Sequence, residues 1–199
     1  MSELQQLPTC TPVDVTKLPT RDGFTVRVAI RSDLQAVRSV VNSAYSVERD
    51  SDEFKFKHTE RFTNDEEPLS HMYFGNQPPP GHKGAFLVLI KQESQRVVGC
   101  IHIESDETNP DTTAQFGPLA VDPALQGQGL GTYLVRVAES VAQQWGCTHL
   151  GLRTANVRTD LLQFYPRLGF QLVGTAPFVQ VERITRPVHF ILMSKALGG

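Results

Sequence analysis

A wide apolar stripe spans residues 130–145 and directly follows a turn with three alternating glycines. Its apolar side chains recur at steps of three and one, the spacing of one helix face; they are Leu130, Tyr133, Leu134, Val137, Ala138, Val141, Ala142 and Trp145. Gly146, a residue typical of helix ends, follows the stripe. The pattern predicts the clearest helix of the chain, and this helix begins at the turn itself.

Segments rich in strand-forming residues lie on both sides of this helix. The predicted strands are Phe24–Ile30, Phe86–Lys91, Arg96–Glu104, Thr113–Val121, His149–Arg153, Gly169–Val173 and Val188–Lys195. One further helix is predicted behind a capping box made by Ser32 and Gln35, and another over Thr159–Leu168. The predicted order is one helical segment, then a meander of strands, then alternating strands and helices. This order predicts a mixed α+β domain.

Composition limits the class of protein. The 199 residues are 40% apolar and 20% charged, with a formal net charge of -2, which suits one folded domain and argues against a general nucleic-acid binder. No apolar run approaches the roughly 18 residues that span a bilayer, and the N-terminus lacks the features of a signal peptide. We therefore expect no nucleic-acid or membrane partner and a cytoplasmic protein, with a nuclear location left open.

Cysteine and histidine usage gives no sign of a metal site. Cys10, Cys100 and Cys147 lie far apart, and the six histidines are scattered, so we expect reduced thiols and no bound metal. Residues 1–22 are polar and contain three prolines, which predicts a flexible N-terminal lead-in. Residues 23–199 are then expected to form a single domain.

The glycine-rich turn is the motif that carries chemistry. Gly127, Gly129 and Gly131 precede the helix, where glycine lets the backbone approach a ligand and the first N–H groups point outward. This arrangement suits a diphosphate. A P-loop is excluded because no Gly-Lys-Ser/Thr follows, and the spacing is not that of a dinucleotide fingerprint. The alternative is a glycine-rich turn that only packs a helix on a sheet.

The sequence resembles the GNAT (GCN5-related N-acetyltransferase) superfamily at two motifs. Gln126, Gly129 and Gly131 match its acyl-CoA signature, Gln/Arg-x-x-Gly-x-Gly/Ala, after the strand ending Leu119–Pro123. Phe164–Phe170 is similar to its second motif, an aromatic-rich helix that runs into Leu-Gly-Phe. The resemblance covers roughly residues 24–195. It implies a mixed, mostly antiparallel central sheet of about six to seven strands, flanked by helices on both faces.

The resemblance also implies acetyl-CoA as co-substrate, with no metal. Its pyrophosphate would lie on the turn and helix start, formed by Gln126, Gly127, Gln128, Gly129, Leu130, Gly131 and Thr132. Its pantetheine arm would pair with the backbone of Leu119 and Val121. An asparagine that contacts the cofactor in the family falls at Arg158 here, with Asn156 two residues earlier, so either residue is a candidate.

The catalytic roles rest on the resemblance and on strand geometry. Tyr165 occupies the family position of the acid that protonates the departing thiolate. If the strands over 96–104 and 113–121 form a hairpin, His102 lies roughly opposite Gln115. One hypothesis is that His102 relays the amine proton, through a water held by Gln115. The alternative is that His102 is a buried sheet histidine and solvent takes the proton.

The expected function is acetyl-CoA-dependent N-acetyl transfer to a primary amine by direct, sequential attack. The acceptor, a small molecule or a peptide, is expected to contact Val47–His71 and Thr175–Pro187, the family's acceptor segments. The alternative from another class is a non-catalytic acyl-CoA-binding or sensor protein of the same fold. A third interpretation is a structural domain whose turn binds nothing. A monomer or homodimer is expected.

Overall fold

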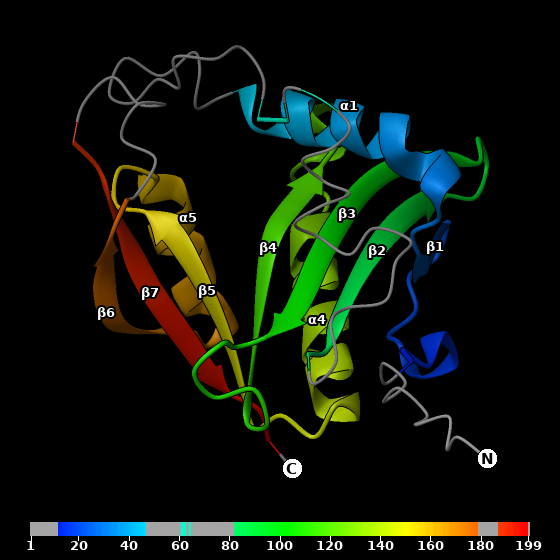
Figure 1. Ribbon diagram of the computed structural model, residues 1–199. Coiled ribbons are helices and arrows are strands. Elements are labelled where there is room, and N and C mark those ends of the chain that lie inside the picture. The colour runs from blue at the N-terminus through cyan, green and yellow to red at the C-terminus, as the bar shows by residue number, and fades with distance from the viewer. Residues whose placement is uncertain (1–11, 47–60, 63, 65–81, 179–186, 199) are drawn as a thin grey trace, which may run out of the picture.

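The computed structural model describes residues 12–46, 61–62, 64, 82–178 and 187–198 (Figure 1). Seven strands form one sheet: β1 (Phe24–Val28), β2 (Gly84–Lys91), β3 (Arg96–Ser105), β4 (Thr113–Val121), β5 (His149–Ala155), β6 (Gln171–Pro177) and β7 (His189–Ala196). The α-helices are α1 (Leu34–Ala44), α4 (Leu130–Gln144) and α5 (Thr159–Phe164). Short 3₁₀ turns are η1 (Val15–Lys17), η2 (Arg31–Asp33), η3 (Pro123–Leu125) and η4 (Tyr165–Leu168).

The strand order is β1-β2-β3-β4-β5-β7-β6. Strands β1 to β4 pair antiparallel as a meander, and β5, β7 and β6 form a second antiparallel group. The two groups are joined by the parallel pair of β4 and β5. This mixed, mostly antiparallel sheet of seven strands confirms the predicted fold class.

Helices cover both faces of the sheet, and each face has its own apolar cluster (Figure 1). The larger cluster lies under α4, which buries the residues Leu130, Tyr133, Leu134, Val135, Val137, Ala138, Val141 and Ala142. The smaller cluster lies under α1 and includes Val37, Val41 and Phe86. Full burial of a large aliphatic or aromatic side chain contributes about 1.5–3 kcal/mol, so the apolar stripe of α4 anchors that helix to the sheet.

The predicted helix over Thr159–Leu168 is divided in two. The α-helical part ends at Phe164, and residues 165–168 form the 3₁₀ turn η4. Pro166 sits at the start of that turn and has no N–H to donate, so it cannot continue the α-helical ladder. The division places Tyr165 at the junction.

Part of the segment predicted as a flexible lead-in is described, from residue 12 onward. Leu18 is 6% exposed and belongs to the cluster under α4, and Tyr133 Oη donates to the Pro19 carbonyl at 2.8 Å. Residues 12–22 are thus packed along α4. Residues 1–11 lie outside the described residues, and the boundary at residue 23 stays a prediction.

None of the described helices is long and apolar enough to cross a membrane. The described residues also hold no cluster of three or more potential metal ligands. Cys100 and Cys147 are buried free thiols, whereas Cys10 lies outside the described residues.

The Asp33 side chain holds the 3₁₀ turn η2 that leads into α1, in place of the predicted capping box of Ser32 and Gln35. The Asp33 carboxylate accepts from the Arg27 guanidinium at 2.6 and 2.8 Å and from the Ile30 N–H at 2.9 Å. Arg27 is on β1, so this pair ties the strand to the helix. The hydrogen bonds from Arg27 hold the pKa of the Asp33 carboxyl below its usual range.

Replacing Asp33 with Asn is expected to lower the free energy of unfolding at pH 7 by about 2 kcal/mol, because Arg27 loses a buried charged partner. The Asp33 pKa is lower in the folded state, so its stabilisation is present above the unfolded pKa of about 3.9 and is lost as pH falls through the folded pKa. Urea unfolding at pH 7 and at pH 2.5 tests this. Asp111→Asn, at an exposed site, is the matched control; an equal effect of both variants would contradict the role of the pair.

Candidate functional site

Strands β4 and β5 are neighbours for only a short distance. Three residue pairs join them, Thr113–His149, Ala114–Leu150 and Gln115–Gly151, and beyond these the two strands diverge (Figure 1). Residues 116–121 of β4 have no described partner strand on the β5 side. The sheet therefore carries an unpaired strand edge in its interior, which opens toward the end of β4.

A β-bulge lies where the divergence begins. Ile101 on β3 pairs with Leu119, but Ile103 pairs with Phe116, so Gly117 and Pro118 on β4 face His102 alone. A bulge bends its strand and increases the local twist. This register corrects the prediction that His102 lies opposite Gln115: Gln115 pairs with Glu104, and His102 faces the bulge.

The backbone groups of Leu119 and Val121 lie along the unpaired side of β4. The Asp122 N–H donates to the Val98 carbonyl on β3 at 2.8 Å, so the alternating backbone groups of Val121 and Leu119 point away from β3. The Val121 carbonyl accepts from Gln126 Nε2 at 3.2 Å, in agreement with that direction. An extended chain lying between β4 and β5 can pair with this edge as an added strand.

The glycine turn follows the end of β4, beyond its unpaired edge. Gly127 and Gly129 both have φ of +77°, the left-handed region that favours glycine, and Gly129 is the N-cap of α4. Residues 126–129 are exposed, whereas Leu130 is 1% exposed and anchors the helix start. Because the first N–H groups of a helix have no partner within it, this turn presents donors to an anion.

One residue outside both sequence motifs reaches the turn. Arg21 Nη2 donates to the Gln128 carbonyl at 2.6 Å. A Cβ placed on Gly129 would lie 3.7 Å from Arg21 Nη1. Sequence reasoning missed Arg21 because it stands 107 residues before its partner and belongs to no local pattern.

Tyr165 lies at the start of η4 and is 6% exposed. Its ring packs edge-to-face against Phe116, Phe164 and Phe170, with centroid distances of 6.0, 5.1 and 5.8 Å. Burial raises the pKa of the Tyr165 phenol well above its usual value, so the hydroxyl keeps its proton at physiological pH. Phe116 is on β4 where the divergence begins, and it links Tyr165 to the open edge.

Asn156 and Arg158 both hold the segment between β5 and α5. Asn156 Oδ1 accepts from the His189 N–H at 3.1 Å, so its side chain extends the β5–β7 pairing by one residue. Arg158 binds Asp160 through Nε at 3.0 Å and Nη2 at 2.9 Å. Their proposed contact with a cofactor stays a prediction.

His102 is 2% exposed and stacks on Phe86 with ring centroids 5.9 Å apart. Its Nδ1 lies 3.3 Å from the Gly117 carbonyl in the bulge. Burial lowers the pKa of His102 to about 4, so the imidazole is neutral at pH 7 and a weak proton acceptor. These observations favour the alternative of a buried sheet histidine.

Glu104 follows two residues later on the same face of β3 and is only half-buried. It pairs with Gln115, the last residue of β4 that still pairs with β5. Burial raises the pKa of the Glu104 carboxyl, and the charge of Arg153 on β5 partly offsets this. Gln115 Nε2 donates to Asp106, so its amide is already engaged. Glu104 and Asp106 are thus both next to Gln115, where the strands separate, and Glu104 lies on β3 directly opposite it.

The segments predicted to contact the acceptor lie mostly outside the described residues. Of Val47–His71, only residues 61, 62 and 64 are described, and of Thr175–Pro187 only 175–178 and 187. Phe178 is buried and packs on Phe190 with ring centroids 4.9 Å apart.

Comparison with known proteins identifies the family. The model of the acetyltransferase (GNAT) family matches residues 42–170, which includes both motifs and the diverging strands. The chain belongs to the GNAT acetyltransferase family. A human relative, N-acetyltransferase 8B, is 29% identical over 106 residues, which are 51% of this chain and 47% of that protein. The match thus spans about half the length of this curated relative.

Solved structures show the same GNAT fold. A GCN5-related N-acetyltransferase from Kribbella flavida superposes with a TM-score of 0.65 at 18% identity, covering 89% of this chain and 100% of that one. A GNAT family acetyltransferase from Elizabethkingia anophelis, solved with acetyl-CoA bound, superposes with a TM-score of 0.58 at 17% identity, covering 89% and 100%.

The two signature glycines provide a matched pair of variants. Gly129→Ala is expected to weaken acetyl-CoA binding about fivefold, because holding an alanine at φ +77° costs about 1 kcal/mol and its methyl would lie beside Arg21. Gly131→Ala is the control: it is helical, and its Cβ would meet only Phe164 Cζ at an ordinary 3.7 Å. Calorimetric titration and thermal melts check both. Equal binding by the two variants would contradict a role of the turn conformation.

Proposed function

We propose that this GNAT family member is an acetyl-CoA-dependent N-acetyltransferase that moves an acetyl group to a primary amine by direct, sequential attack. The observation that carries the proposal is the open edge of β4 ending in the exposed glycine turn. An extended pantetheine arm fits the edge and a pyrophosphate fits the turn, in one continuous line. The E. anophelis structure with acetyl-CoA bound supports the choice of ligand.

Binding of acetyl-CoA along the β4 edge and the glycine turn would orient its thioester. The N–H groups from Gly127 to Thr132 would hold the pyrophosphate, with Gln126 beside them and Asn156 or Arg158 contacting the cofactor from the segment between β5 and α5. The backbone of Leu119 and Val121 would pair with the pantetheine amides. A backbone N–H of this edge would then polarise the thioester carbonyl, and removal of such a donor typically costs about 3 kcal/mol of barrier.

The reaction exchanges one C–S bond for one C–N bond. The neutral amine nitrogen attacks the thioester carbon, and collapse of the tetrahedral intermediate expels the CoA thiolate. Tyr165 is suited to give that thiolate a proton, since its phenol stays protonated and lies beside Phe116 at the divergence.

The proton lost by the amine needs an acceptor. We assign this role to Glu104, directly or through one water, because its carboxylate stands where β4 and β5 separate and is half-buried. His102, the earlier hypothesis, has both a lower pKa and less access to solvent. Solvent as the acceptor is the remaining alternative.

A second candidate is a non-catalytic acyl-CoA-binding protein with the same opening. The observation that favours it is the register, which places Gln115 opposite Glu104 and not His102, so the water predicted between Gln115 and His102 has no support. Retention of Tyr165 at the divergence counts against it. For the enzyme the acceptor amine would belong to a small molecule or a peptide, and in either case the protein would act as a monomer or a homodimer.

Thiol release from acetyl-CoA against a panel of polyamines, amino acids, aminoglycosides and lysine peptides tests the proposal. Turnover with one class is expected, and Tyr165→Phe should lower kcat about 100-fold with a smaller change in acetyl-CoA affinity. Calorimetric titration with CoA, done in parallel, measures cofactor binding. Binding without turnover on any amine would favour the non-catalytic candidate, and no binding would reject both.

The pH dependence of kcat distinguishes the two candidate bases. A base acts only when deprotonated, so the rate should rise with pH through the Glu104 pKa, and Glu104→Gln should remove this limb and lower kcat about 100-fold. His102→Gln, with its fold checked by thermal melting, should keep the limb. Glu93→Gln, with a side chain 82% exposed, is the charge-matched control. An unchanged profile for Glu104→Gln would exclude it, and loss of the limb in His102→Gln would restore the earlier hypothesis.

A further inference from the structure

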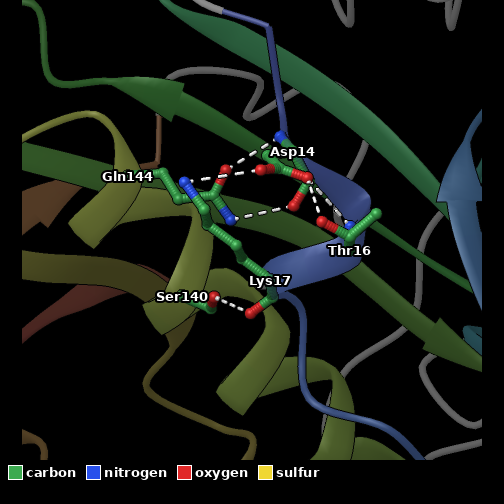
Figure 2. A network of polar contacts seen from close by, with 5 residues as sticks. All are labelled: Asp14, Thr16, Lys17, Ser140 and Gln144. Carbon is green, nitrogen blue, oxygen red and sulfur yellow. Dashed lines mark hydrogen bonds and ion pairs between the residues drawn. The ribbon is translucent and has the colours of Figure 1, made fainter.

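The described part of the N-terminal segment, residues 12–22, lies as a strap along α4. Figure 2 shows its anchor: the Asp14 N–H donates to Gln144 Oε1 at 2.8 Å, and Gln144 Nε2 donates to the Asp14 carbonyl at 3.2 Å. Ser140 Oγ donates to the Lys17 carbonyl at 3.1 Å. With the Tyr133–Pro19 hydrogen bond, these contacts follow α4 back toward its N-terminus. The strap thus runs toward the glycine turn.

Arg21 stands at the end of the strap that reaches the turn. Its carbonyl accepts from the Phe24 N–H at 3.0 Å, which fixes the backbone just before β1. One guanidinium nitrogen donates to Gln128, and the group as a whole is exposed. A guanidinium has five N–H donors, and the bond to Gln128 uses one of them. Within the described part of the chain Arg21 forms no ion pair.

The turn itself has no cationic side chain. Residues 126–132 read Gln-Gly-Gln-Gly-Leu-Gly-Thr, so they supply only neutral N–H and polar groups. The first signature position, which accepts Gln or Arg in the family, holds Gln126 here. A site for a diphosphate is more favourable with a positive charge beside its backbone donors. Arg21 is the described cation that touches the turn.

We propose that Arg21 is a cofactor-binding residue whose guanidinium binds the phosphates of CoA. The packing of the strap along α4 positions Arg21 for this contact. This inference rests on the proposed function, since it assigns one more residue to the same ligand. The hydrogen bond to Gln128 pre-positions the guanidinium, which reduces the side-chain entropy lost on binding. The charge thus comes from a segment 107 residues away in sequence.

Calorimetric titration of acetyl-CoA measures this contribution in the full chain. Arg21→Ala is expected to weaken binding about tenfold, the low end for a charge-assisted contact at an exposed site, and the loss should shrink at high salt. Arg21→Lys keeps the charge without the planar fork and should lose less. Lys17→Ala is the matched control, because Lys17 is a cation on the same strap, 70% exposed and ion-paired with Asp14 at 3.4 Å. It should bind within twofold of wild type.

S-acetylpantetheine, an acetyl donor without phosphates, distinguishes a phosphate contact of Arg21 from a role of Arg21 in shaping the turn. Its kcat/KM should be the same in wild type and Arg21→Ala, because it has no pyrophosphate for the guanidinium to contact. Equal losses with both donors would show that Arg21 only shapes the turn, and would overturn the inference. Unchanged acetyl-CoA affinity in Arg21→Ala would overturn the inference alone. Failure of wild type to bind acetyl-CoA would reject the proposed function and this inference with it.

Discussion

The early end of the β4–β5 pairing is the constraint on which the rest of the site depends. A sheet normally satisfies its interior strands on both sides, and an unpaired interior edge leaves backbone donors and acceptors exposed. Here the bulge at Gly117 and Pro118 bends β4 away from β5 after three pairs. The resulting edge is a template for one more extended chain. Every proposed role, from the glycine turn to Tyr165 and Glu104, is defined by its place along that edge.

Burial separates the roles of side chains that are close in sequence. His102 and Glu104 share a face of β3, two residues apart, yet one is 2% exposed and the other is half-buried. Burial disfavours the charged form in both, which lowers the pKa of the histidine and raises that of the carboxyl. The same effect makes the Glu104 carboxylate a stronger base than a solvated carboxylate and leaves His102 neutral at pH 7. A tyrosine buried among three phenylalanines is likewise kept as a proton donor.

Local patterns were sufficient for most elements. The apolar stripe of residues 130–145 became α4 within one residue at its end, and the strand over Thr113–Val121 has the predicted bounds. Both are dictated by periodicity within one segment. The pairing of strands was not, because the register of β3 on β4 places Gln115 opposite Glu104, two residues beyond the predicted His102. The packing of residues 12–22 also escaped prediction, since its contacts are made with α4, more than 100 residues later in the chain.

The sequence alone determined the class of fold, the family resemblance and the position of the glycine turn, because periodicity and a short signature are properties of neighbouring residues. Tertiary structure decided which groups meet at the turn and at the diverging strands. The register across the bulge, the burial of His102 and the approach of Arg21 to Gln128 depend on segments distant in sequence. Such contacts are set by the packing of the whole sheet and its helices, and no local pattern encodes them.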